Sequence, residues 1–320
     1  MRSKSNATAS ATITGLGLGA LGVLAFSMTM PATRVAVQQL DPGFVAFGRA
    51  VGAGLLAVAN LRLTRAPRPS RAQWRKLAVV ALGVVVGFPL FTSLALTTQT
   101  STHGAVVVTL LPAVTAVFAV LRAGERPSPL FWAASAAGLL TILTFLITSG
   151  TVRGALSVAD LFLLAAVVLC GLGYAEGGVL ARDLGGARTI CWALVLSLPV
   201  TVPVAVLAGA AHPPRADAAA WTAFGYVTVV SMFLGFFAWY AGLAAGGIAR
   251  VGQIQLGQPL LTMAWSALLL EEAVGVGAIG AALVVLACIV LVHRTRATAP
   301  TPTPTPTPTP ASPPAPALPR

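Results

Sequence analysis

IARVGQIQLGQPLLTMAWSALLLEE, residues Ile248 to Glu272, has the length of a membrane-spanning helix but carries three glutamines and a proline. Its apolar part, 251–270, supplies about the twenty residues that the hydrocarbon core of a bilayer requires. At about 100° per residue, most of the polar side chains share one helical face with a valine. This face holds Val251, Gln255, Gln258, Thr262 and Trp265. Because amides in hydrocarbon are unfavourable without partners, we expect the face to point into protein or into a wet cavity.

Pro259 interrupts this predicted helix, because it removes one backbone donor and leaves a carbonyl without its helical partner. A polar, interrupted helix at membrane depth is typical of a transporter's substrate site. Gln255 and Gln258 lie one turn apart and can contact the same ligand group, since an amide both donates and accepts hydrogen bonds. The alternative is that these glutamines only join neighbouring helices, as polar side chains in membrane proteins often do.

The composition is that of a polytopic membrane protein. Of 320 residues, 57% are hydrophobic and only 9% are charged, whereas soluble domains have about 25% charged residues. The net charge of +12 does not indicate nucleic acid, because the basic residues lie in short loops between apolar runs. The three cysteines lie inside apolar runs, and none of the three histidines is near a carboxylate in sequence. We therefore expect no disulfide framework, no metal site and no cofactor.

Ten apolar runs follow a short polar start, residues 1–12, which we interpret as a cytoplasmic tail. The predicted spans are Ile13–Met30, Gly43–Leu61, Leu77–Leu96, Gly104–Leu121, Leu130–Thr148, Val158–Leu180, Ile190–Gly209, Trp221–Leu243, Val251–Leu270 and Val276–Val292. Residues 298–320 are a Thr-Pro repeat that runs into Pro and Ala, which predicts a disordered tail.

The basic residues of the loops predict the orientation. With the amino terminus inside, alternate loops hold most of them. The inner set is Arg62, Arg65, Arg68, Arg71, Arg75, Lys76, Arg122, Arg126, Arg182, Arg188, Arg250, Arg294 and Arg296. The outer loops hold only Arg34, Arg153 and Arg215. Positive residues concentrate on the cytoplasmic side of membrane proteins, so both termini are expected in the cytoplasm.

The chain also repeats itself. A shift of 147 residues aligns an uncommon tryptophan, proline and glutamate without a gap. The aligned pairs are Trp74 with Trp221, Pro112 with Pro259, Thr115 with Thr262, and Glu125 with Glu272. Each copy, 13–148 and 158–292, has five spans, and an odd number inverts the second copy in the membrane. Inverted repeats recur in secondary transporters. At this shift Gln255 and Gln258 correspond to Val108 and Leu111, which predicts a cavity that is polar on one side and apolar on the other.

Several short segments carry a family resemblance. They are Pro42 to Arg49 (PGFVAFGR), Leu111-Pro112, Arg122 to Glu125 (RAGE), Gln258-Pro259, Leu270-Glu271-Glu272 and Gly280. Combined with the length, the span count and the two copies, they make the chain similar to ten-span members of the drug/metabolite transporter superfamily, of the EamA type. The resemblance covers about Ile13 to Val292. It implies two five-helix bundles around a central cavity and the movement of small metabolites such as amino acids.

Arg49 lies about two turns inside the second span. A charge at mid-membrane costs at least about 2.5–3.5 kcal/mol on insertion scales, so the residue needs a partner or a function. One interpretation is contact with an anion or carboxylate in the cavity. The other is a packing role, with the guanidinium held by carbonyls or extended toward the membrane surface.

Glu176 is taken as the one acid inside a span. Burial disfavours the charged form of a carboxylate, so such a group can bind and release a proton and couple transport to it. The alternative is a structural pair with Arg182, one and a half turns further along the chain. Glu125 and Glu272 lie at span ends and are expected to be boundary residues.

Aromatic residues follow one face of the eighth span at helical spacing: Phe233, Phe236, Phe237 and Tyr240. They are candidates to line a cavity for apolar or cationic groups, although such stripes are more often packing. Ser27, Thr29 and the Pro89–Ser93 segment are weaker candidates for cavity polarity.

These features together predict an all-α membrane protein with ten transmembrane helices in two inverted five-helix repeats. We expect a secondary active transporter in the cell membrane that moves small metabolites or drugs by alternating access, with export as the expected direction. Its partners are then a small-molecule substrate and the lipid bilayer, and a homodimer is compatible with the sequence. The alternatives are a membrane-embedded enzyme and a non-transporting scaffold. No catalytic constellation supports an enzyme, since Ser101 and His103 lie in a polar loop without an acid.

Overall fold

The computed structural model describes residues 2–148 and 157–270, together with 284 and 287, and all regular structure in that part of the chain is helical. The elements are α1 (Arg2–Ser27), α2 (Thr29–Val37), α3 (Pro42–Leu63), α4 (Arg71–Val80), η1 (Ala81–Gly87), α5 (Phe88–Ala95), α6 (Ser101–Val108), α7 (Leu111–Ala123), α8 (Pro129–Thr148), α9 (Val158–Leu184), α10 (Gly186–Ala211), α11 (Ala218–Tyr226), η2 (Val227–Leu234), α12 (Gly235–Gly246), α13 (Ile248–Gly252), η3 (Gln253–Gly257) and α14 (Gln258–Leu270). The prediction of an all-α membrane protein is confirmed.

Six stretches of the described chain are long and apolar enough to cross a membrane: Thr12–Val37, Pro42–Leu63, Arg71–Ala95, Val158–Leu184, Gly186–Ala211 and Ala218–Gly246. Leu111–Ala123 and Pro129–Thr141 are shorter apolar helices. The predicted fourth and ninth spans are each divided into shorter helices, α6–α7 and α13–η3–α14. The predicted tenth span and the Thr-Pro tail lie outside the described residues, apart from 284 and 287.

The first span is longer than the sequence predicted, because helix continues from Thr29 to Val37. The polar residues that suggested its end have partners or are buried. Thr33 is fully buried, and Arg34 donates hydrogen bonds to the carbonyls of Leu96 and Thr97. A polar residue therefore does not end a helix here, since the adjacent helix supplies the acceptors.

The irregular segments recur at the spacing of the sequence repeat. The π-helical segments η1 and η2 begin 146 residues apart and end 147 residues apart. Helices α7 and α14 begin 147 residues apart, and each has a proline in its first turn. Proline is favoured there because its missing N–H has no acceptor in the helix. Both halves of the chain thus interrupt their third and fourth spans at corresponding positions.

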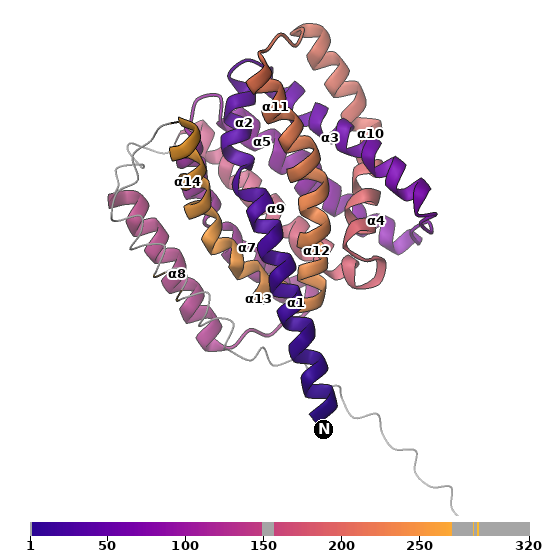
Figure 1. Ribbon diagram of the computed structural model, residues 1–320, viewed down its shortest axis with the longest axis vertical. Coiled ribbons are helices and arrows are strands. Elements are labelled where there is room, and N and C mark those ends of the chain that lie inside the picture. Colours follow the sequence, from indigo (N-terminus) through magenta and orange to yellow (C-terminus); the bar gives the residue numbers. More distant parts are fainter. Residues whose placement is uncertain (1, 149–156, 271–283, 285–286, 288–320) are drawn as a thin grey trace, which may run out of the picture.

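The two halves pack reciprocally, since the first span of each half contacts the third span of the other (Figure 1). Helix α1 of the first half runs beside α12 of the second, and α9 packs against η1 and α5. Helices α3 and α10, which correspond to each other in the repeat, also pack together. Helix α8 lies at the edge of the bundle in Figure 1.

Glycines allow the close approach of α1 and α12. A Cβ atom on Gly15 would lie 2.5 Å from the backbone nitrogen of Gly246, and one on Gly242 would lie 2.7 Å from that of Gly19. Each helix thus presents two glycines four residues apart, the spacing that lets membrane helices meet at their backbones. This contact joins the first half of the chain to the second.

Candidate functional site

A small cavity lies at the centre of the bundle, between the two halves. Its volume is about 20 Å³, roughly the space of one water molecule. The lining residues are Phe26, Thr29, Met30, Arg49, Val84, Phe88, Leu111, Cys170, Tyr174, Ser231, Met232, Phe236 and Gln258. Ligand sites of proteins usually hold about 300 Å³ or more, so in this conformation the cavity has room only for a water-sized group.

The irregular segments of both halves meet at this cavity. Val84 of η1 and Ser231 of η2 line it, as do Leu111 and Gln258, the first residues of α7 and α14. At the two corresponding positions the wall is apolar at Leu111 and polar at Gln258, the asymmetry that the repeat predicts.

Arg49 is the one arginine or lysine among the residues that line the cavity, and its exposed fraction is only 1%. Its Nε and Nη1 atoms have no hydrogen-bond partner among the described residues. A buried guanidinium with N–H groups unpaired is unfavourable, and an anionic group in the cavity would compensate for that cost. Arg49 thus lines the cavity with N–H groups that lack partners, and its role as a carboxylate contact stays a prediction.

The polar face of the ninth span serves two different purposes along its length. Thr262 donates a 2.7 Å hydrogen bond to the carbonyl of Ser27, and Trp265 Nε1 donates to Ser27 Oγ at 2.9 Å. These two residues join the span to α1. Gln258 Oε1 and both amide atoms of Gln255 have no partner of normal hydrogen-bond geometry among the described residues. The role of Gln255 and Gln258 as substrate contacts stays a prediction.

Gln258 lines the cavity itself, whereas Gln255 is buried outside the cavity lining, beside Tyr174. Thr262 also lies outside the lining. Of the three polar candidates in this span, the structure thus places one on the cavity wall.

Aromatic rings form the apolar part of the cavity. Phe236 lies 4.9 Å from Phe26 and 6.0 Å from Tyr174 between ring centroids, and all three rings line the cavity. Tyr240 instead donates a hydrogen bond of 3.1 Å to the carbonyl of Gly173, away from the cavity lining. Sequence reasoning missed Phe26, because a single phenylalanine in an apolar span gives no pattern.

Charged residues join the two halves at the carboxyl end of α9, which we call the Arg182 end. The alternative interpretation of Glu176, a structural pair with Arg182, is wrong. Glu176 instead accepts a 2.9 Å hydrogen bond from Arg122, and Arg182 pairs with Glu125 at 3.0 Å. The end of α7 and the loop after it bring Arg122 and Glu125 of the first half beside α9 of the second, which sequence spacing does not show.

Glu125 also does more than end a span. Its two carboxylate oxygens accept hydrogen bonds of 2.8 Å from the backbone nitrogens of Ile248 and Ala249. These are free donors at the start of α13, where a negative charge is favourable. One carboxylate therefore connects the loop after α7, the end of α9 and the start of the ninth span.

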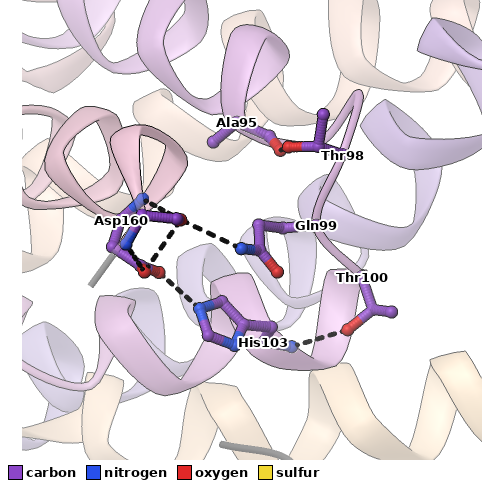
Figure 2. A network of polar contacts seen from close by, with 7 residues as sticks. Ala95, Thr98, Gln99, Thr100, His103 and Asp160 are labelled. Atoms are coloured by element: carbon purple, nitrogen blue, oxygen red, sulfur yellow. Dashed lines mark hydrogen bonds and ion pairs between the residues drawn. The ribbon is translucent and has the colours of Figure 1, made fainter. Parts of the chain in front are cut away.

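A second group of contacts lies at the amino end of α9, which we call the Asp160 end (Figure 2). His103 Nε2 lies 2.5 Å from Asp160 Oδ1, and Gln99 donates a 3.2 Å hydrogen bond to Ser157 Oγ. The view of Glu176 as the one acid inside a span is wrong, since Asp160 is a buried residue of the same helix. His103 also has an acid beside it, supplied by a span 57 residues away.

This arrangement does not form a metal site or a serine triad. The described residues contain no group of three or more histidine, cysteine or acidic side chains that could hold a metal ion. Ser101 hydrogen-bonds to Ser266 at 3.0 Å. The contacts at both ends of α9 are thus pairs between helices.

Comparisons with known proteins agree with this architecture. The model of the EamA-like transporter family matches residues 13–147 and 157–294. An uncharacterized transporter of Bacillus subtilis, YdeK, is 45% identical over 276 residues, which cover 86% of this chain and 96% of that protein. An uncharacterized transporter of Archaeoglobus fulgidus is 24% identical over 260 residues, 79% of this chain and 88% of its own.

One crystal structure of a protein has the same fold, with a TM-score of 0.70 and 18% identity, over 89% of this chain and 98% of that one. The family match covers both halves of the chain separately. This chain therefore belongs to the EamA-like transporter family and is a multi-pass, all-α membrane transporter rather than an enzyme.

Proposed function

We propose that the protein is a secondary active transporter that moves small metabolites by alternating access of the central cavity. The observation that carries this proposal is a buried cavity between the two halves, in which Arg49 and Gln258 have polar atoms without partners. Unpaired polar atoms on the wall of a cavity suit contact with a polar group of a small ligand. Two corresponding halves with interrupted spans can rearrange against each other and expose the cavity to either side.

The cavity favours an amphipathic substrate with a carboxylate. Arg49 attracts negative charge, and the unpaired Gln258 Oε1 can accept one further hydrogen bond. The opposite wall is formed by the rings of Phe26, Tyr174 and Phe236. Amino acids with apolar side chains combine both chemistries, so we place them before amines and other drugs.

The proposal includes a direction and a coupling ion. The loop arginines favour a cell-membrane protein with both termini in the cytoplasm, which puts the Arg182 end inside. We propose export driven by protons, with Glu176 as a proton carrier. Because Glu176 pairs with Arg122 of the other half, its protonation would remove one charge that holds the halves together at this end. The pair must separate for the cavity to open inward.

Transport in sealed proteoliposomes tests the function directly. We expect uptake of amino acids with apolar side chains from a panel of amino acids, amines and drugs, with the substrate recovered unchanged. Arg49→Gln should reduce transport of carboxylate substrates at least tenfold, and Arg49→Lys should retain more of it. Arg188→Gln, which changes an exposed arginine, is the matched control. Conversion of the substrate without movement would overturn the proposal.

Cysteine probes test the ninth span. With cysteine at position 258, a water-soluble thiol reagent should label the protein, and the substrate identified in proteoliposomes should protect it. Position 255, beside Tyr174, should label more slowly. If neither position is ever labelled, both glutamines only pack between helices.

The orientation has a separate test. A cysteine that replaces His212 should react with an impermeant reagent added outside intact cells, and one that replaces Arg68 should not. The reverse pattern would contradict the proposed topology.

A further inference from the structure

The His103–Asp160 pair joins the two halves of the transporter. His103 belongs to α6 in the first half, and Asp160 to the first turn of α9 in the second half. The 2.5 Å contact lies inside the protein, with side-chain exposed fractions of 14% and 10%. An interaction between the halves must break if they separate at this end during alternating access.

The acid is held in place by its own helix. Asp160 Oδ2 accepts hydrogen bonds from the backbone nitrogen of Ser157 at 2.8 Å and from its hydroxyl at 2.9 Å. Ser157 in turn accepts the hydrogen bond from Gln99 of the first half. Asp160 Oδ1 thus remains directed at the imidazole (Figure 2). The backbone nitrogen of His103 donates a 3.1 Å hydrogen bond to Thr100 Oγ1, which caps the first turn of α6.

Few other charges act on this pair. Among the described residues of α8 and α14, which pack against α6, there is no acidic or basic side chain. Helix α2 brings Arg34, which is bonded to the carbonyls of Leu96 and Thr97. At the other end of α9, Arg122 of α7 bonds to Glu176, and Gly178 contacts Ile248 of α13, the helix that carries Arg250.

Imidazole is the side chain that ordinarily changes its charge between about pH 5 and pH 8. With the proton, the contact joins an imidazolium to a carboxylate, and without it a neutral N–H donates to the same oxygen. Hydrogen bonds between charged partners are roughly twice as strong as those between neutral ones. The same contact between the halves is therefore stronger when a proton is bound.

We propose that His103 and Asp160 form a proton-binding site whose occupancy holds the two halves together at the Asp160 end. The proposal rests on the proposed function, because it takes the opening of this end as a step of transport. Proton binding favours the state closed at the Asp160 end, and proton release allows that end to open. With the proposed topology, an acidic exterior closes the outer side, as an exchange of protons for an exported substrate requires.

Distance measurements in lipid nanodiscs test this site without any substrate. Spin labels at Thr98→Cys and Leu161→Cys, both exposed positions in opposite halves, report the separation at the Asp160 end in a background without native cysteines. We expect one short distance at about pH 5.5 and a growing population of longer distances toward about pH 8.5. His103→Gln should remove this pH dependence.

The matched control is His212→Gln. His212 lies 3.5 Å from Asp41 in the other described histidine–carboxylate pair, but its side chain is 73% exposed. This variant should keep the pH-dependent distances. A distance that does not change with pH in the parent, or a pH dependence that survives in His103→Gln, would overturn the proposal.

Nuclear magnetic resonance of ¹⁵N-histidine keeps the test decisive if His103→Gln does not fold. In the parent protein the His103 imidazole should gain a proton within the same pH range as the distance change. An imidazole that does not titrate between about pH 5 and pH 9 would also overturn the proposal. Neither measurement depends on transport. A protein that does not transport in proteoliposomes would therefore contradict the proposed function alone.

Discussion

The two ends of α9 join the same halves of the transporter with different chemistry. At the Arg182 end, two arginines pair with two glutamates, and Glu125 also binds the start of α13. Arginine stays protonated at every accessible pH, so the positive partners here are permanent. At the Asp160 end, one imidazole pairs with one carboxylate, beside a single amide–hydroxyl contact. The two ends thus differ in the positive partner of their ion pairs, which is a permanent cation at the Arg182 end and an imidazole at the Asp160 end.

The largest expected effect is that of Glu125→Ala. It removes three hydrogen bonds to one carboxylate, from Arg182 and from the backbone nitrogens of Ile248 and Ala249. Hydrogen bonds to charged groups contribute roughly 1.5–3 kcal/mol each when buried, and this side chain is partly exposed. We expect a loss of about 2–4 kcal/mol in the free energy of unfolding, measured by denaturant titration in micelles. A loss no larger than that of Arg182→Ala would mean that the backbone contacts contribute nothing.

A smaller effect separates the roles of Arg122 and Glu176. The glutamate side chain is 4% exposed and the arginine side chain 47%. Arg122→Gln leaves a buried carboxylate without its charged partner, whereas Glu176→Gln leaves an arginine that water can reach. Arg122→Gln should therefore destabilise the protein more, by about 1–3 kcal/mol, and the double variant should recover part of that loss. Equal losses in the two single variants would contradict the burial argument.

The contrast between the ends also shows what sequence can predict. Pro259 predicted the interruption near Gln258, because proline acts locally on the backbone. The corresponding interruption near Leu111 was not predicted, although Pro112 aligns with Pro259 in the repeat. The face of the ninth span was also predicted, since helical periodicity is local. The division of that face into residues that bond to α1 and residues that do not was not predicted. Thr262 bonds to the carbonyl of Ser27, which lies 235 residues away in the sequence. Contacts between spans depend on packing, which spacing within one span does not encode.

The same limit explains the two pairs of α9. Glu176 was interpreted as a proton-coupling residue because it lies inside an apolar run. Its partner, Arg122, comes from the end of α7. Asp160 was overlooked because it lies in the first turn of its helix, where an acid is expected as a capping residue. It does cap the helix through Ser157, and only the packing of α6 gives it a second role with His103.

The smallest effect is expected from Asp217, which joins the halves at the side that the topology assigns to the Asp160 end. Its side chain accepts hydrogen bonds from the backbone nitrogen of Ala220 and from Gln39. The hydrogen bond from Ala220, followed by that from Gln39, holds the pKa of Asp217 below its usual value. A depressed pKa means that the carboxylate stabilises the folded state above the unfolded pKa of about 3.9 and loses this contribution as pH falls through the lower folded value.

Asp217→Asn keeps the cap but cannot titrate. The spin-label distances of this variant should match those of the parent from about pH 5.5 to pH 8.5, because Asp217 remains ionised throughout this range. A changed pH midpoint in Asp217→Asn would show that His103 is not the group that sets the pH dependence at the Asp160 end.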